Sequence, residues 1–248
     1  MYFDKKVTVV MPALNEAKAI GKVVSELKAL RHQHKATIDE IIVCDNGSTD
    51  DTAAVCESLG ATVVKQVIGG YGIACLTAID AIVDTDIVLF VDADDSCDIS
   101  QAHSLLQGVI DGADLVIGSR VLGNIEKGAL TPLQRFGNAL SSVLIRLLWH
   151  HPITDLGPFR AIKMHSLKQL DMQDKKFGWT VEMQVKAIQL GLIVRETAVN
   201  SKVRIGKSKI SGTIRGSIGA GIGILSMIAK LRWQQRDFRK ASLAQSNN

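Results

Sequence analysis

The chain has 248 residues, of which 46% are hydrophobic and 22% charged, so it can build the core of one large α/β domain. An aromatic content of 4% leaves few rings to stack on bases, and no nucleic-acid-binding motif is present, which excludes nucleic acid as an expected partner. The net charge of +4 is unevenly divided: residues 1–100 hold 8 Lys and Arg against 16 Asp and Glu, whereas residues 101–248 hold 21 against 9. The first part is therefore suited to hold a cation, and the last part to meet an anion such as the phosphates of a membrane surface.

Short β-branched runs alternate with helical patterns through the first half of the chain. This alternation predicts parallel βαβ crossovers and an α/β fold with an open, doubly wound, mostly parallel sheet. Ligands bind such sheets at the carboxyl ends of the strands. The expected strands span residues 7–11, 38–44, 62–66, 87–91 and 115–118, and the expected helices span 16–30, 51–59, 100–111 and the stretch from the glycine loop at 69–72 to about 83.

The second half is less regular. Residues 132–150 predict a long amphipathic helix, residues 152–163 an extended or looped segment, and residues 178–190 another helix. We expect a catalytic domain at residues 1–212 and an apolar, basic, helical extension at 213–248. The uncharged run in the extension is too short to cross a bilayer, which takes about 20 residues. The extension either lies on an anionic membrane, docks on the core, or mediates homo-oligomer formation.

Four cysteines occur without Cys-x-x-Cys spacing, which favours small buried thiols over a disulfide framework or a zinc site. The N-terminal residues lead straight into a predicted strand, and no signal peptide is recognised. Both features predict a cytoplasmic protein. The basic C-terminal part would allow it to bind peripherally at the inner face of the cell membrane.

Two carboxylates, Asp92 and Asp94, follow the apolar run 87–91 and are separated only by Ala93. A buried strand that releases two carboxylates at one edge of a sheet suits a hard divalent cation. Mg²⁺ is usually held by one or two carboxylates together with the oxygens of a bound phosphate. Acidic residues also close strands as simple solvated loops, so the neighbouring segments decide between the two interpretations.

Five segments in chain order carry a resemblance to a known family: Pro-Ala-x-Asn-Glu at 12–16, Asp-Asn-Gly-Ser-Thr-Asp at 45–50, the glycine loop at 69–72, Asp-Ala-Asp at 92–94 and Gly-Ser-Arg at 118–120. Together they resemble the family 2 inverting glycosyltransferases, most closely the polyprenyl-phosphate (dolichyl-phosphate) mannosyl- and glucosyltransferases. The resemblance covers roughly residues 6–215. It implies a glycosyltransferase-A fold, a UDP- or GDP-sugar as donor, and Mg²⁺ or Mn²⁺ as cofactor.

The resemblance also implies roles for particular residues. Asp92 and Asp94 would bind the metal ion. Asn46 stands where the family commonly has a second acid, and Asp95 stands where it often has an uncharged residue, so both positions depart from the pattern. The donor would lie against Pro12, Ala13, Asn15, Glu16, Asp45, Gly72, Asp92 and Ala93.

Three later segments extend the resemblance. Residues 154–161 are similar to an Asp-x-x-x-Gly-Phe-Arg segment, with Pro158 as a departure, and residues 178–182 are similar to an acidic helix start on the acceptor side. Residues 204–209 resemble a flexible loop that grips phosphate; the plain alternative is a solvated turn. The resemblance thus implies phosphate-binding roles for Arg160, Arg204, Ser208 and Lys209.

These residues suggest a mechanism in which departure of the nucleoside diphosphate builds negative charge that the metal and basic side chains stabilise. A lipid phosphate acceptor is already anionic and needs no general base. A sugar hydroxyl needs one, and Glu182 or Asp155 is then the candidate. We therefore predict a hexosyltransferase with polyprenyl phosphate as the preferred acceptor, and with catalytic roles for Asp94, Arg120, Asp155 and Glu182.

Two other classes remain open at this point. The Asp-x-Asp-x-Ser pattern at 92–96 also fits haloacid-dehalogenase-like phosphatases, although their nucleophile follows the first strand and this one follows roughly the fourth. A non-catalytic nucleotide-sugar-binding partner of a membrane enzyme is the second alternative. Loss of turnover on replacing Asp94 would distinguish a transferase from a scaffold.

Overall fold

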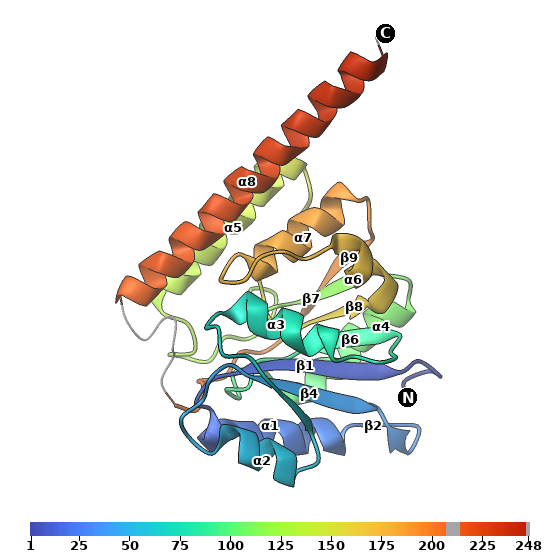
Figure 1. Ribbon diagram of the computed structural model, residues 1–248, viewed down its shortest axis with the longest axis vertical. Coiled ribbons are helices and arrows are strands. Elements are labelled where there is room, and N and C mark those ends of the chain that lie inside the picture. Colours follow the sequence, from blue (N-terminus) through green and yellow to red (C-terminus); the bar gives the residue numbers. More distant parts are fainter. Residues whose placement is uncertain (207–213, 247–248) are drawn as a thin grey trace.

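The computed structural model describes residues 1–206 and 214–246. Its centre is a 7-stranded sheet of order β5-β4-β1-β6-β8-β7-β9, with helices on both faces (Figure 1). The strands are β1 (Val7–Ala13), β4 (Glu40–Asp45), β5 (Thr62–Lys65), β6 (Ile87–Phe90), β7 (Leu115–Ser119), β8 (Arg160–Lys163) and β9 (Val194–Ala198), and a small hairpin pairs β2 (Arg31–His32) with β3 (Lys35–Ala36). The helices are α1 (Ala17–Ala29), α2 (Thr52–Ser58), α3 (Tyr71–Asp80), α4 (Ala102–Ile110), α5 (Pro132–Trp149), α6 (Met164–Leu170), α7 (Trp179–Gln189) and α8 (Ile214–Ser246), and a 3₁₀ turn, η1 (Ile99–Gln101), precedes α4.

The predicted mostly parallel, doubly wound sheet is confirmed. β1 pairs in parallel with β4 and β6, β4 with β5, and β7 with β9. β8 is antiparallel to both of its neighbours, β6 and β7. The sequence predicted only an extended or looped segment at residues 152–163. It predicted no strand there, because β8 begins with Arg160 and lacks a continuous apolar run. β9, α6 and the small hairpin were not predicted either; β9 is a polar strand at the sheet edge.

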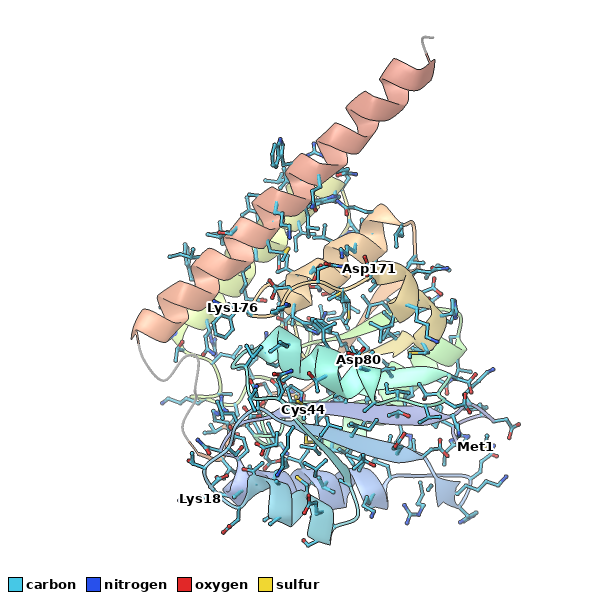
Figure 2. The ribbon with its side chains drawn as sticks, viewed as in Figure 1. Met1, Lys18, Cys44, Asp80, Asp171 and Lys176 are labelled. Atoms are coloured by element: carbon cyan, nitrogen blue, oxygen red, sulfur yellow. The ribbon has the colours of Figure 1, made fainter. Side chains whose placement is uncertain are left out.

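Each face of the sheet has its own apolar layer. Val9 and Met11 of β1 point toward the face covered by α1 and α4, whereas Val10 points toward the face covered by α3, α6 and α7. This alternation follows from the period of two along a strand. The four cysteines are buried and free, as predicted, and Cys44 lies within the sheet (Figure 2).

A third apolar cluster lies outside the two sheet layers, where α5, α7 and α8 meet. Met227, Ile228 and Leu231 of α8 pack there against Ile145 of α5 and Val185 of α7. α5 and α8 lie side by side, and α8 continues past the body of the molecule toward the C-terminus (Figure 1). Part of the extension therefore docks on the core. Within the described ranges, none of the helices combines the length and the apolar character that crossing a membrane would take.

Candidate active site

The carboxyl ends of β1, β4 and β6 meet at one edge of the sheet. Ala13 is in register with Asp45, and the Val91 N–H donates to the Val10 carbonyl, so the chain segments after all three strands start side by side. Parallel pairing thus brings together residues 12–16, 45–50 and 92–94, which are far apart in sequence.

The loops after β1 and β4 hold each other through hydrogen bonds. The Asn15 side-chain oxygen accepts the Thr49 N–H at 2.7 Å, and the Asn15 N–H donates to the Ser48 hydroxyl at 2.9 Å. Asn15 has a φ of 53°, a left-handed conformation that asparagine tolerates well. One oxygen of Asp45, Oδ1, accepts the Ser48 N–H at 2.9 Å. The predicted donor residues on these two loops therefore lie together, with Pro12 partly buried and Ala13, Glu16 and Asp45 buried.

Asn46 uses its whole amide to shape the glycine loop. Its Nδ2 donates to the carbonyls of Gln66 and Ile68 at 2.9 and 2.7 Å, and its Oδ1 accepts the Gly70 N–H at 2.8 Å. A carboxylate can only accept, so an aspartate here could not make the two donor bonds. This explains physically why asparagine stands at the position where a second acid was expected.

The glycine loop packs against protein, and this corrects one prediction. The Gly72 N–H donates to the Lys176 carbonyl at 3.1 Å, and a Cβ at Gly72 would collide with the backbone of Asp174. Gly72 is therefore needed for the close approach of residues 174–176, and its amide has no free proton for a donor molecule.

The two aspartates after β6 form an acidic corner that basic and hydroxyl groups surround. Asp92 Oδ1 accepts the Tyr71 hydroxyl at 3.0 Å, and Asp94 Oδ2 lies 3.0 Å from Arg204 Nη2. The same Arg204 atom lies 3.0 Å from Glu16, so the basic segment after β9 does reach the acidic corner. Burial, and next the charge of Asp94, raise the pKa of Asp92 to about 7.

The residues in this corner fit a divalent cation that shares a phosphate ligand. Among the described residues no group of three or more His, Cys, Asp or Glu could enclose a metal by itself. Two carboxylates with a bound diphosphate are the usual Mg²⁺ arrangement. Burial and the charge of Asp94 raise the pKa of Asp92, and a bound cation would offset both by stabilising the charged carboxylate. Asp95 does not join them, since its carboxylate pairs with Lys22 at 2.6 Å and with Lys202 at 2.7 Å.

Arg120, which is partly exposed, forms a bidentate ion pair with the buried Asp155. Arg120 Nε and Nη2 lie 2.8 and 2.7 Å from the Asp155 oxygens, and the Arg120 N–H also donates to Asp155 at 2.7 Å. Glu196 accepts the backbone N–H groups of Thr154 and Asp155 and so fixes the segment. Asp155 is 0% exposed. Both of its oxygens are engaged, so the structure does not support Asp155 as a general base; it orients Arg120.

Glu182 and Arg160 also stabilise the fold, whereas the sequence predicted a general base at Glu182 and a phosphate-binding residue at Arg160. The Glu182 carboxylate accepts the N–H groups of Gln173 and Asp174 at 3.0 and 2.7 Å and pairs with Lys186 at 2.8 Å, so it holds a loop. Arg160 is 1% exposed and donates to the carbonyls of Leu156, Gly157 and Thr180, which leaves no surface for a phosphate. Ser208 and Lys209 lie outside the described residues.

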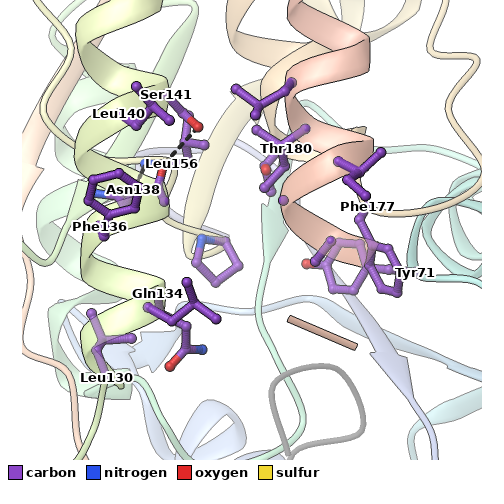
Figure 3. A pocket seen from close by; sticks show the side chains of 18 of the residues that line it. Tyr71, Leu130, Gln134, Phe136, Asn138, Leu140, Ser141, Leu156, Phe177 and Thr180 are labelled. Atoms are coloured by element: carbon purple, nitrogen blue, oxygen red, sulfur yellow. Dashed lines mark hydrogen bonds between the residues drawn. The ribbon is translucent and has the colours of Figure 1, made fainter. Parts of the chain in front are cut away.

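Two cavities meet at this corner. A cavity of about 280 Å³ is lined by Asp92, Asp94, Arg120 and Arg204, among others. An apolar groove of about 440 Å³ runs between α5 and α8 (Figure 3). Sequence reasoning missed the groove, although the amphipathic pattern of α5 gave part of the signal. Both cavities are lined by Asp92, Arg120, Leu130, Gln134 and Pro158.

A mostly parallel α/β sheet with an acidic pair and flanking arginines at its carboxyl edge is typical of proteins that bind a phosphate-bearing ligand there. The family model described as "Glycosyl transferase family 2" matches residues 8–171. The chain therefore belongs to glycosyltransferase family 2 and is a glycosyltransferase. This membership favours the glycosyltransferase over the two open alternatives, the phosphatase and the non-catalytic binder.

Relatives and solved structures agree with the family. An uncharacterized glycosyltransferase of Mycobacterium tuberculosis is 36% identical over 225 residues, covering 90% of this chain and 98% of that protein. A dolichyl-phosphate hexose transferase of Haloferax volcanii is 28% identical over 238 residues, covering 93% and 98%. Glucosyl-3-phosphoglycerate synthase from Mycobacterium tuberculosis, in complex with Mn²⁺, UDP and phosphoglyceric acid, superposes with a TM-score of 0.73 at 21% identity, covering 93% of this chain and 79% of that one. A second structure of that synthase, with Mg²⁺ and UDP, gives 0.72 at 21% identity, covering 92% and 80%. The expected glycosyltransferase-A fold is thereby confirmed.

Proposed function

We propose that this chain transfers a hexose, with inversion, from a UDP- or GDP-sugar to a polyprenyl phosphate, using Mg²⁺ or Mn²⁺. One observation carries the choice of acceptor: the apolar groove between α5 and α8 opens onto Arg120 and Asp92. A molecule with one anionic head and a long hydrocarbon tail matches that combination. The dolichyl-phosphate hexose transferase of Haloferax volcanii supports the same acceptor class by its name.

For the donor, we assign the nucleoside to the corner built by Pro12, Ala13, Asn15 and Asp45. Asp92 and Asp94 would hold the metal ion; solved structures of the mycobacterial synthase contain Mn²⁺ or Mg²⁺ together with UDP. When bound, the ion would neutralise the diphosphate and stabilise its departure. Arg204 lies 3.0 Å from Asp94 and would add a second positive charge beside the leaving diphosphate.

For the acceptor, we assign the phosphate to Arg120. Its guanidinium is held by Asp155, and its side chain is 21% exposed where the two cavities meet. A phosphate oxygen is anionic near neutral pH and attacks without a general base. This agrees with the engagement of both candidate bases, Asp155 and Glu182, in other contacts. Catalysis would then rest on positioning and charge stabilisation.

A membrane surface is the proposed source of the lipid, which makes the enzyme peripheral at the cytoplasmic face. α5 contains no Asp or Glu, and its exposed basic residues include Arg135 and Arg146; Lys230 is exposed on α8. Exposed apolar side chains continue outward from the groove along both helices, a composition suited to lying on an anionic bilayer. These apolar residues are Leu133, Phe136, Val143, Leu147, Ile222, Leu225 and Trp233.

A thermal-unfolding experiment with three probes tests this acceptor assignment. A short polyprenyl phosphate in detergent should stabilise the protein more than the matching polyprenol or inorganic phosphate, because it alone fills the groove and meets Arg120. Equal stabilisation by polyprenol and polyprenyl phosphate would contradict recognition of the head group. Calorimetric titrations of the protein with UDP-glucose and with GDP-mannose, each with and without Mn²⁺, then identify the donor.

A further inference from the structure

Tyr71, the first residue of α3, touches both halves of the site. Its hydroxyl donates to Asp92 Oδ1 at 3.0 Å, while its ring lines the apolar groove. Figure 3 shows Tyr71 beside Phe177 on one wall of the groove, with Gln134 and Phe136 on the other. One side chain therefore joins the surface proposed to receive the lipid to a carboxylate proposed to bind the metal.

The backbone beneath Tyr71 is held from two sides. Asn46 accepts the Gly70 N–H, and the N–H groups of Gly72 and Ile73 donate to the carbonyls of residues 176 and 175. A Cβ at Gly70 or Gly72 would collide with that same segment, so glycine permits the contact. Glu182 fixes the segment in turn. The phenol is thus placed by a rigid support, which is what a group that orients another side chain needs.

We infer that Tyr71 is a positioning residue: it holds Asp92 in the orientation that binds the metal and couples that orientation to the filling of the groove. The inference rests on the proposed function. Hydrogen bonds to metal-binding carboxylates set their orientation, and losing one typically costs about 10- to 100-fold in metal affinity or activity. A lipid packed on the Tyr71 ring would keep the ring from turning away from Asp92. Because coupling between two sites is reciprocal, the lipid should then tighten metal binding.

Replacing Tyr71 by phenylalanine removes the hydroxyl and keeps the ring. Calorimetric Mn²⁺ titrations in the presence of UDP, with and without polyprenyl phosphate, should show about 10- to 100-fold weaker Mn²⁺ binding for Tyr71→Phe. The lipid should tighten Mn²⁺ binding in the parent protein and not in the variant. In steady state, kcat should fall, and KM for the lipid at saturating Mn²⁺ should rise only by the coupling factor that the parent protein shows.

Tyr2→Phe is the matched control, because Tyr2 is the other tyrosine of the chain and its hydroxyl bonds Gln107 and His103 far from this edge of the sheet. It should behave as the parent protein. Tyr71→Leu, which loses the ring as well, should weaken Mn²⁺ binding equally and also raise KM for the lipid.

The outcomes separate the two proposals. If the parent protein binds no Mn²⁺ with UDP and transfers no sugar, the proposed function fails. If the parent protein binds and transfers, but Tyr71→Phe matches it in Mn²⁺ affinity, in kcat and in its response to lipid, the role of Tyr71 is overturned. A loss of thermal stability without any change in Mn²⁺ affinity would likewise show that Tyr71 is merely structural.

Discussion

The proposed donor corner, formed by residues 12–16, 45–50 and 92–94, and the apolar groove between α5 and α8 are two parts of one site built in different ways. In the donor corner, Asn15, Asp45 and Asp92 each lie within a few residues of a strand end, and parallel register brings them together. In the groove, α5 ends at residue 149 and α8 begins at residue 214, and helix packing alone joins them. The first part is polar and cross-linked by hydrogen bonds; the second is apolar and partly open. The site therefore combines a polar frame at the sheet edge with a separate apolar surface between two helices.

The largest effect should follow from changing the charge of the donor corner. Asp94→Asn keeps the shape of the side chain and removes half of the proposed metal-binding charge, so turnover should fall by about 10³-fold. Circular dichroism checks the fold, and a transfer assay measures the loss. Near-normal turnover would break the assignment of the acidic corner to catalysis.

Filling the groove should affect the acceptor side alone. Gly137 lines the groove on α5, and a Cβ there meets nothing within 4 Å, so Gly137→Leu projects into the groove without a backbone clash. KM for polyprenyl phosphate should rise by at least about tenfold, the scale of a misplaced apolar group in a pocket. Calorimetric donor affinity should not change. Gly137→Ala is the control, with a small effect and better helix propensity.

The outer surface of the same helices should control membrane binding. Leu147 is 64% exposed on α5 and does not line the groove, so Leu147→Asp should lower sedimentation with anionic vesicles by about tenfold. Val83→Asp is the matched control, because Val83 is 97% exposed on the segment between α3 and β6, outside α5 and α8. Equal losses in both variants would contradict a specific α5–α8 membrane surface.

Glu182→Gln tests whether the Glu182 carboxylate stabilises the fold or acts as a general base. Glu182 accepts two backbone N–H groups and pairs with Lys186, so the variant should lose about 1–3 kcal/mol of unfolding free energy. Turnover per folded molecule should remain nearly unchanged. Denaturant unfolding and a transfer assay, run on the same sample, measure the two quantities. A collapse of turnover with retained stability would restore Glu182 as a general base.

The smallest expected effect is the pH dependence of the rise in Tm that Mn²⁺ with UDP produces. Because the pKa of Asp92 is raised from 3.8 to about 7, the folded metal-free protein holds this proton more tightly than the unfolded chain. Its contribution to stability is therefore present at low pH and is lost as pH rises toward 7. A bound metal replaces that proton, so Mn²⁺ with UDP should raise the Tm more at pH 8 than at pH 6. A larger Mn²⁺ effect at pH 6 would contradict this sign.

Much of the donor side could be predicted from the sequence, because buried parallel strands appear as continuous β-branched runs. The strands expected at 7–11 and 87–91 are observed at Val7–Ala13 and Ile87–Phe90. The polar residues that follow such strands converge by register, so their neighbourhood was also predictable. β8 was not predicted as a strand, because its first residue, Arg160, is a buried charge whose partners are the carbonyls of Gly157 and Thr180.

The roles of single side chains were harder to predict, because they depend on partners far away in the chain. Asp155 is engaged by Arg120, 35 residues earlier, and the Gly72 N–H is taken by the 176 carbonyl. The sequence indicated no role for Tyr71 in the site beyond its position in the glycine loop. Sequence patterns thus locate a site well, and tertiary hydrogen bonds decide which of its residues remain free for a ligand.

The most direct test of the account is a product assay with purified protein, Mn²⁺ and radiolabelled UDP-glucose or GDP-mannose. Three acceptors are supplied in parallel: polyprenyl phosphate, polyprenol and phosphoglyceric acid. The account predicts a single hexosyl phosphate-linked lipid that forms only with polyprenyl phosphate and requires the metal. Transfer to phosphoglyceric acid or to a free hydroxyl, with none to polyprenyl phosphate, would contradict it.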